Sequence, residues 1–552
     1  MKQLKNLFLI FIFLSTFKIE FITTFKCGSK TLNITPGIID TLPKSNIRKI
    51  QEIPKPEGGG DKLKDGNEKE QNRSIIIGYD YTLFDKNNET TNETKNQLKR
   101  LFNETSDLFN KILQVKVKHI GGINDKELKY LINTRCKVNE TVENISNFVT
   151  SVNDVTIFPV FETIKDESDN GTIWMRGKYC LITRDMFPIG GLLQINKDIN
   201  FEKENSYDYF KHIIFHEMTH ILIFEPNLMR GLNMVKNKQV ITKGVKLAAR
   251  HYFNCIKFIE DKDFGVPLDE DGYHWNSRYM LGEYMISFDY FDKTMSDMTL
   301  ALFDDSGRYY IDNLYGRYFN FGKNKSCSFF EKKCIENEKP NFEEFCTTNN
   351  EPKCSQSRMS KGNCLIEEYD YNISSNHQYF NSSYLGGFKE TEYCPVSNYN
   401  LTQNYYFSTS CKYENNNNGN KEYGEIFGND SFCFISSLVA FNSNNDIKNK
   451  SVCYKVECDY TNKMIIVNID NQKVNCTTNG GIVFDPPGFN GSLICPKYFE
   501  ICNEGSDYIC KDMFDCINET LARDYVYDDE SGELIKYNLI LISLILSIFI
   551  IF

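Results

Sequence analysis

The sequence predicts an α+β protein in which a region of mixed helices and strands is followed by a disulfide-rich region of loops and strands. Apolar residues make up 41 % of the chain, enough for buried cores, and helical and strand patterns alternate up to about residue 325. Of the 19 cysteines, 15 lie between Cys327 and Cys516, where helical periods are few and no CxxC pair occurs. This density favours disulfides formed in an oxidising compartment over zinc clusters.

Within residues 73–325 the side-chain patterns predict seven elements. In chain order we expect a strand at 73–84, a helix at 95–117, strands at 155–164 and 191–199, and helices at 206–224, 244–259 and 277–290. The first helix places apolar residues at helical spacing, so we expect them in the core: Leu98, Leu101, Phe102, Leu108, Phe109 and Leu113. Residues 326–530 form the predicted cysteine-rich region.

Both ends of the chain carry apolar runs that are typical of targeting signals. Lys2 and Lys5 precede one such run, which predicts a signal peptide over residues 1–23. Residues 531–552 close with YNLILISLILSIFIIF. As a helix this run would be about 24 Å long, short of the roughly 30 Å of a hydrocarbon core. We interpret this hydrophobic segment as a GPI-attachment signal, with a short transmembrane tail as the alternative.

These signals predict where the protein acts. With abundant N-x-[ST] sequons, they indicate a glycoprotein of the secretory pathway, extracellular or at the cell surface, that meets the membrane through its C-terminal anchor. Residues 24–72 include the charged, glycine-rich stretch KPEGGGDKLKDGNEKEQNR, which predicts a pro-segment or linker. The formal net charge is −11 and no basic stripe occurs, so we expect no nucleic-acid partner.

The segment KHIIFHEMTHILIF, residues 211–224, carries the strongest chemical signal. On a helix, His216 and His220 lie one turn apart on one face, where two imidazoles can bind one Zn²⁺. Glu217 is one step round the helix, placed to take a proton from water rather than to bind metal. An HExxH motif also occurs by chance in proteins without metal. In so apolar a segment, however, an unpaired Glu217 would be costly to bury.

A catalytic zinc site needs a third protein ligand and an open position for water. In compact zinc proteases a third histidine comes six residues after the second, but Pro226 stands there. The ligand must therefore come from farther along the chain. The remaining histidines are His119, His212, His251, His274 and His377. His212 could share the face of His216, but we interpret it as a polar side chain near the helix start.

Four stretches in this order, HEMTHILIF, ARHYFNCIKF, GVPLDEDGYHW and LGEYM, resemble the leishmanolysin family of metzincin metallopeptidases. The resemblance covers about residues 74–334; beyond that only the cysteine-rich character is shared. It implies a metzincin-type catalytic domain over 73–325, with a long insertion between the second and third zinc histidines. It also implies that His274 is the third ligand and that His251 is not a ligand. Met285 matches the Met-turn methionine and Glu283 the acidic residue before it.

The resemblance implies a zinc endopeptidase that cleaves proteins or peptides, with one Zn²⁺ per chain. Glu217 would act as general base, and Met285 would form an apolar floor without a chemical step. It also implies the disulfides Cys136–Cys180 and Cys255–Cys327. Relatives use a pro-segment cysteine to block zinc, a role that Cys27 could take.

One departure favours an alternative. The family has a glycine where this chain has Ile223, and a β-branched residue disfavours positive φ, so we expect a rebuilt or deformed turn. The alternative function is a catalytically weak or inactive surface protein for cell adhesion or binding on the same scaffold.

Overall fold

The computed structural model describes residues 25–26, 37–39, 72–116, 130, 134–136, 153–164, 172–198, 206–288, 290, 292–311, 318–398, 409–414, 421–443, 445–502 and 513. The expected signal peptide, Cys27 and the hydrophobic C-terminal segment lie outside the described residues, as does His119. Within the described part of the chain, no helix is both long enough and apolar enough to cross a membrane.

A five-stranded sheet with the order β2-β8-β9-β6-β4 forms the centre of the first region. Its strands are β2 (Gly37–Ile39), β4 (Ile77–Tyr79), β6 (Val155–Glu162), β8 (Met175–Thr183) and β9 (Pro188–Asn196). β8 and β9 are antiparallel, and the other neighbouring pairs are parallel. Every residue of β9 is buried, which shows that both faces of the sheet are covered there.

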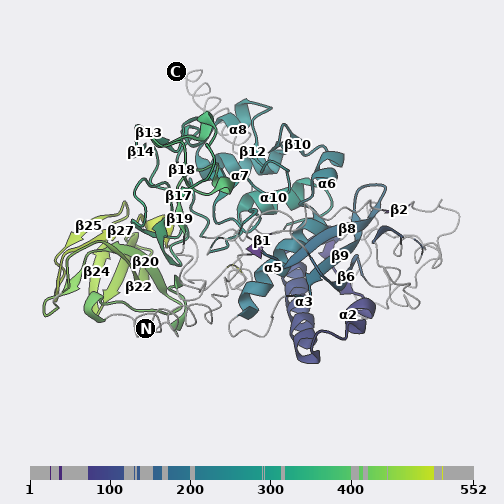
Figure 1. Ribbon diagram of the computed structural model, residues 1–552, viewed down its shortest axis with the longest axis horizontal. Coiled ribbons are helices and arrows are strands. Elements are labelled where there is room, and N and C mark those ends of the chain that lie inside the picture. The colour runs from purple at the N-terminus through teal and green to yellow at the C-terminus, as the bar shows by residue number, and fades with distance from the viewer. Residues whose placement is uncertain are drawn as a thin grey trace, which may run out of the picture.

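Two long helices pack on this sheet (Figure 1). α5 (Ser206–Leu222) lies against β8 and β9, and α3 (Asn92–Ile112) lies beside α5 and against β4. The Thr91 side chain caps α3 by accepting a hydrogen bond from the Thr94 backbone. The apolar residues expected on this helix are all buried, and Phe109 stacks on Phe215 of α5 with ring centroids 4.3 Å apart. The helix prediction is therefore confirmed over residues 95–112, together with its core face, but its expected end at residue 117 is wrong, because a strand, β5, occupies Gln114–Lys116.

Short elements surround this layer. They are β1 (Phe25–Lys26), β3 (Asn72–Ser74), α2 (Thr82–Lys86), β5 (Gln114–Lys116), β7 (Thr172–Ile173), α6 (Pro226–Gly231), β10 (Val235–Lys236), β11 (Gln239–Val240), α7 (Lys243–Phe253), α8 (Lys257–Glu260), β12 (Val266–Pro267), α9 (Ser277–Met280), α10 (Asp297–Asp305) and α11 (Ser328–Glu331). β1 runs parallel to β7, and β2 runs parallel to β8.

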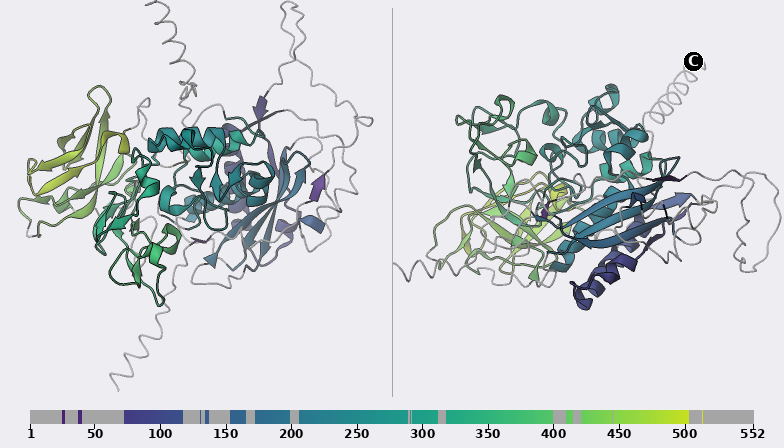
Figure 2. Two further views of the ribbon diagram at one scale, coloured as in Figure 1. Left: turned by 90° about the horizontal axis from the view of Figure 1, so that it is seen from above. Right: turned by 45° about the vertical axis from the view of Figure 1, so that its right-hand side comes forward.

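The cysteine-rich region is built around a six-stranded antiparallel sheet with the order β24-β23-β22-β20-β27-β25. Its strands are β20 (Ser431–Ser436), β22 (Lys450–Asp459), β23 (Met464–Ile469), β24 (Gln472–Cys476), β25 (Gly481–Phe484) and β27 (Ser492–Cys495). Smaller sheets precede or flank it, formed by β13 (Ile335–Glu336), β14 (Lys339–Pro340), β15 (Pro352–Cys354), β16 (Lys361–Cys364), β17 (Glu367–Glu368), β18 (Leu385–Gly386), β19 (Ser397–Asn398), β21 (Val439–Ala440) and β26 (Phe489–Asn490). The views of Figure 2 place the six-stranded sheet at one end of the molecule and the central sheet at the other.

Eight disulfides are present among the described residues. Cys136–Cys180 and Cys255–Cys327 are the two pairs that the resemblance implied. The others are Cys334–Cys394, Cys346–Cys364, Cys354–Cys433, Cys411–Cys453, Cys458–Cys502 and Cys476–Cys495. Together with the mixed helices and sheets and the β-rich second region, they confirm the α+β, disulfide-rich class.

Three further predicted elements are wrong in part. The strand expected at 73–84 ends at β4, and α2 follows, because Asp80 accepts a hydrogen bond from the Thr82 backbone and starts a turn. The helix expected at 244–259 breaks into α7 and α8 at Asn254, which has the left-handed φ of 57°. The helix expected at 277–290 ends after α9, and Gly282 follows with φ 88°.

Candidate metal centre

α5 carries His216 and His220 on one face, as the four-residue spacing predicts. Both side chains are buried, at 2 % and 0 % exposure, among the apolar residues of the core. Their Nε2 atoms lie 3.1 Å apart, and the ring centroids are 4.7 Å apart. The helix thus brings two imidazole nitrogens to one point.

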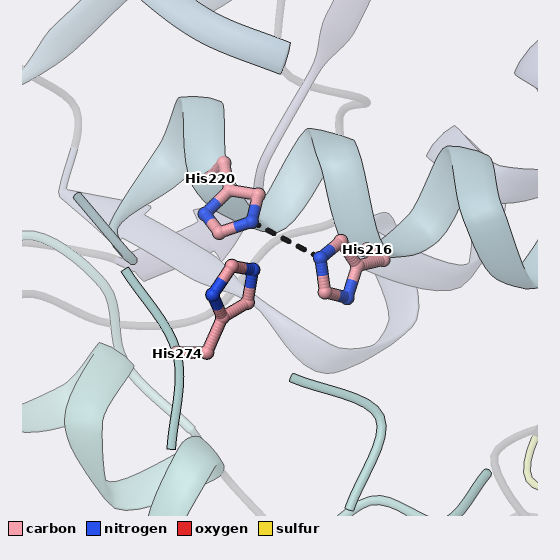
Figure 3. A group of neighbouring side chains, drawn as sticks. All are labelled: His216, His220 and His274. Carbon is pink, nitrogen blue, oxygen red and sulfur yellow. Dashed lines mark hydrogen bonds between the residues drawn. The ribbon is translucent and has the colours of Figure 1, made fainter. Parts of the chain in front are cut away.

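His274 reaches the same point from a tight loop after β12. The loop is closed by an isolated bridge between Leu268 and Trp275 and by a 2.9 Å hydrogen bond from the Asp269 backbone to the His274 carbonyl. The His274 ring centroid is 5.3 Å from that of His216 and 4.9 Å from that of His220. One ring nitrogen from each histidine lies within 4.8 Å of the other two, and Figure 3 shows the rings facing one another.

The Nδ1 atoms point away from this meeting point and toward oxygens. His216 Nδ1 donates to the Tyr284 carbonyl at 2.7 Å, and His220 Nδ1 donates to the Phe224 carbonyl at 2.7 Å. His274 Nδ1 donates to Asp269 Oδ2 at 2.8 Å. Because these oxygens can only accept, the protons belong on Nδ1 and the lone pairs on Nε2.

Three converging lone pairs fit a metal ion. Two acceptor nitrogens 3.1 Å apart repel each other unless a cation lies near both. The Nε2 of His274 is buried and makes no hydrogen bond within the described part of the chain. Burial, then the neighbouring imidazoles, lower the pKa of His216 well below its usual value and that of His220 to about 3. The rings of His216 and His220 therefore stay neutral, which is the form that binds metal.

Glu217 directly follows His216 on α5 and is completely buried. Its Oε2 accepts a 2.6 Å hydrogen bond from the backbone of Gly177 on β8. A Cβ atom at Gly177 would lie 2.1 Å from the Glu217 carbonyl oxygen, so a glycine is needed for β8 to approach α5 this closely. We had not singled out Gly177 from the sequence, although a glycine inside a strand pattern is a known sign of close backbone approach.

The turn after α5 is rebuilt without a left-handed residue. The backbone amides of Ile223 and Phe224 both donate to the Thr219 carbonyl, at 2.9 and 3.0 Å. Ile223 is not among the described residues with positive φ, and its side chain is 1 % exposed. Glu225 then caps α6 by accepting from the backbones of Asn227 and Leu228. The family glycine is therefore not required by the turn that this chain adopts.

Glu225 also ties the turn to the sheet. Its carboxylate lies 3.5 Å from Lys178 Nζ, and both side chains are almost fully buried. Lys178 follows Gly177 on β8, so the strand contacts α5 and the turn after it at successive residues. The sequence had not drawn attention to this pair.

Met285 and Glu283 lie in the chain segment next to His216. Met285 is fully buried, and its carbonyl accepts from the Trp275 backbone at 3.0 Å. Glu283 is buried too and accepts hydrogen bonds from Met285 N at 2.5 Å and Thr299 Oγ1 at 2.5 Å. Burial raises the pKa of Glu283 to about 7. These bonds shape the turn whose Tyr284 carbonyl holds His216.

The other histidines are placed elsewhere. His212 lies in the second turn of α5, near the helix start as expected, but its side chain is only 5 % exposed and so lies inside the core. His251 is exposed on α7, and His377 lies in the cysteine-rich region. Within the residues that the structure describes, His216, His220 and His274 form the one cluster suited to a metal ion.

The site therefore combines an HExxH helix with a distant third histidine. The leishmanolysin family model matches residues 86–508, and the chain belongs to this family. It is 26 % identical to a leishmanolysin of Leishmania chagasi over 54 % of this chain and 52 % of the relative. It is 24 % identical to the ciliated left-right organizer metallopeptidase of Danio rerio over 58 % of this chain and 50 % of the relative.

A leishmanolysin-like peptidase of Drosophila pseudoobscura pseudoobscura is 25 % identical over 48 % of this chain and 44 % of the relative. The chain thus spans about half the length of the curated relatives it matches.

Proposed function

We propose that this protein is a zinc endopeptidase with a metzincin-type catalytic domain, in which His216, His220 and His274 hold one Zn²⁺ and Glu217 is the general base. The observation that carries the proposal is the convergence of three Nε2 lone pairs at a helix that also carries the buried Glu217. When bound, the ion would lower the pKa of a water molecule and polarise the scissile carbonyl. The substrates are proteins or peptides, as the names of the relatives suggest.

Each residue of the site has a separate task in this proposal. Glu217 accepts a proton from the attacking water and returns it to the departing amine. Its contact with Gly177 N supports this role, because it fixes the carboxylate of the residue that directly follows the ligand His216. Met285 takes no chemical step and fills the apolar space next to Tyr284.

The proposal is tested by metal analysis of the purified protein together with a protein-digestion assay, with and without chelator. We expect zinc near one per chain and cleavage that stops on chelation and returns with added zinc. The alternative is an adhesion or binding protein on the same scaffold. It would be favoured by a protein that binds cells or ligands yet holds no zinc and cleaves nothing.

We also propose that residues 24–72 act as a pro-segment. β1 pairs with Thr172–Ile173, and β2 pairs with Leu181–Thr183 along β8. Gly177, which contacts Glu217, lies between these two pairings on the same stretch of chain. β1 and β2 therefore pair with the chain on either side of Gly177. Removal of residues 24–72 should raise the rate of protein digestion. A Cys27→Ala variant of the full chain tests whether a thiol is needed for this inhibition.

We place this activity at the cell surface, with residues 326–530 as a cysteine-rich module and residues 531–552 as the GPI-attachment signal. The eight disulfides support an oxidising compartment. Release of the protein from cells by a phosphatidylinositol-specific phospholipase would support the anchor. A membrane-bound protein that resists this treatment and keeps residues 531–552 would favour the transmembrane tail.

A further inference from the structure

His274 differs from the other two histidines in the group that holds its Nδ1 atom. A backbone carbonyl accepts from Nδ1 of His216 and of His220, whereas a carboxylate, Asp269 Oδ2, accepts from His274 at 2.8 Å. A carbonyl carries a partial charge, but a carboxylate carries a full one, and a charged acceptor makes the stronger hydrogen bond. Among the three histidines, His274 is therefore the one whose Nδ1 atom donates to a charged group.

Asp269 is itself held firmly inside the loop that presents His274. Its Oδ1 accepts from the backbone amides of Gly272 at 2.6 Å and Tyr273 at 3.0 Å. Its own amide donates to the His274 carbonyl at 2.9 Å. Gly272 has φ 77°, which lets the loop turn tightly enough for these contacts. The two carboxylate oxygens thus have different tasks: one closes the loop and the other faces the imidazole.

The balance of charge at the metal centre also favours a carboxylate next to His274. Imidazoles that bind a metal through Nε2 are neutral ligands, so a divalent cation held by them would bring two uncompensated positive charges into a buried space. The carboxyl groups of Glu217 and Asp269 can each supply one negative charge. Asp269 reaches the ion through the His274 ring, an arrangement that fixes the tautomer and raises the basicity of the ligand.

We propose that Asp269 is a positioning residue that fixes the Nδ1–H tautomer of His274 and supplies counter-charge to the metal centre. This inference rests on the proposed function only in that the three histidines bind zinc. It makes the loop from Asp269 to His274 a preformed unit. The third ligand is oriented by contacts within six residues of chain, although it stands far from His220 in the sequence.

The variant Asp269→Asn separates this role from a purely structural one. The amides of Gly272 and Tyr273 keep the Asn oxygen on their side, so the Asn amino group must face His274 Nδ1. A donor facing Nδ1 favours the tautomer with its proton on Nε2. In that tautomer, Nε2 of His274 has no lone pair for the metal ion. Asp269→Ala loses the loop contacts as well, but leaves the imidazole free to take either tautomer.

The experiment measures zinc affinity by competition with a chromophoric chelator, and the thermal stability of the zinc-free protein, for both variants. We expect Asp269→Asn to bind zinc about 10–100-fold more weakly than the native protein and at least as weakly as Asp269→Ala. In the zinc-free protein, Asp269→Asn should melt close to the native protein and above Asp269→Ala. The matched control is Glu270→Gln, an exposed neighbour in the same loop whose zinc affinity should not change.

Three other outcomes would count against the inference. Equal zinc affinities of the native protein and Asp269→Asn would overturn it while leaving the proposed function intact. A rank order in which Asp269→Ala is worse in both measurements would reduce Asp269 to a structural residue. A native protein that binds no zinc under any condition would overturn the proposed function, and this inference with it.

Discussion

The helix that carries His216 and His220 is a regular element inside an apolar core, whereas the chain that carries His274 has little regular structure and adds polar contacts to its apolar packing. α5 packs on β8 and β9, with Ile221 next to Gly191, and on α3 through Phe215; no disulfide joins it to the sheet within the described residues. The third-ligand segment, residues 266–286, also buries apolar side chains such as Trp275 and Met285, but it relies in addition on Asp269, Glu283 and the nearby bridge Cys255–Cys327.

This difference concerns how a metal site can be assembled from distant parts of a chain. On the helix, secondary structure alone places two ligands at the right spacing. For the third ligand, closing the 54 residues from His220 to His274 costs about 3.5 kcal/mol plus a constant by the (3/2)RT ln n rule. Polar contacts and a disulfide must hold that loop before metal arrives. Different mutations should therefore disrupt the two ligands on α5 and the third-ligand segment.

The largest expected effect is the loss of the third ligand. His274→Ala leaves two histidines on α5, so zinc affinity should fall by more than the roughly 10–100-fold that changes to a ligand's hydrogen-bond partner cost. Peptidase activity should fall with it. The control is His251→Ala, the same chemical change at an exposed position on α7. If zinc content survives His274→Ala and is lost in His251→Ala, the ligand assignment is wrong.

Next in size is the removal of the proposed base. Glu217→Ala should keep zinc, because no ligand is removed, but should slow peptide cleavage by about 10²–10⁴-fold. Glu217→Gln, which keeps the shape and can still accept from Gly177 N, should behave alike. Near-native cleavage by a zinc-loaded Glu217→Ala protein would rule out the general-base role.

Removal of a disulfide tests whether the third-ligand segment depends on the bridge Cys255–Cys327. By the chain-entropy rule, a bridge such as Cys255–Cys327, with a sequence separation of 72, restricts the unfolded chain by roughly 4 kcal/mol. Replacing both cysteines with serine should lower the melting temperature and weaken zinc binding together.

The matched control for this change is the pair Cys458–Cys502 in the cysteine-rich region, with a separation of 44 and a similar expected cost of about 4 kcal/mol. Its removal should lower the melting temperature but leave zinc affinity unchanged. Equal effects of the two double variants on zinc affinity would mean that Cys255–Cys327 does not preform the site.

Just after the end of α5, the structure changes the expected effect of a mutation at Ile223. From the sequence, Ile223→Gly should raise activity or leave it unchanged, since a glycine would relieve strain. The structure shows no positive φ there and a buried side chain. We now expect the variant to lose about 3–4 kcal/mol of stability, from the cavity and from the flexibility of glycine. A denaturant titration checks this, and a higher melting point or faster cleavage would restore the strain hypothesis.

The sequence also predicted the helices α3 and α5 better than it predicted the third-ligand segment. Regular periodicity is enough to predict α3 and α5 and the apolar residues that they bury. The third-ligand segment misled the same reasoning: Met280, Leu281, Tyr284 and Met285 imitate a helical pattern over 277–290, but hydrogen bonds to Glu283 fold it into turns. Its ligand and bridge came from family resemblance, because neither spacing nor periodicity reports contacts between distant residues.

Gly177, Glu225 and Asp269 were not singled out from the sequence for the same reason. Each acts through a neighbour that is known only once the chain is folded: α5 for Gly177, Lys178 for Glu225 and His274 for Asp269. Such residues surround the ligands rather than bind metal, so no ligand spacing marks them.

The smallest expected effect is a pH dependence confined to the third-ligand segment. Burial raises the pKa of Glu283 to about 7, while the same group in the unfolded chain titrates near its usual value. Between these two pKa values the folded protein keeps the proton and the unfolded chain releases it. The free energy of unfolding should therefore fall as pH rises through this window, by about 3 kcal/mol in total, and level off above it.

Glu283→Gln should remove this slope, because glutamine imitates the protonated acid and does not titrate. The comparison is made on the zinc-free protein, by denaturant titrations between pH 4.5 and pH 8. The native protein should lose stability relative to the variant as pH rises, and the two should differ least near pH 4.5. Parallel curves for the two proteins would show that Glu283 is already ionised in the folded state. The third-ligand segment would then have to accommodate a buried charge through the hydrogen bonds from Thr299, Ser296 and the Met285 backbone.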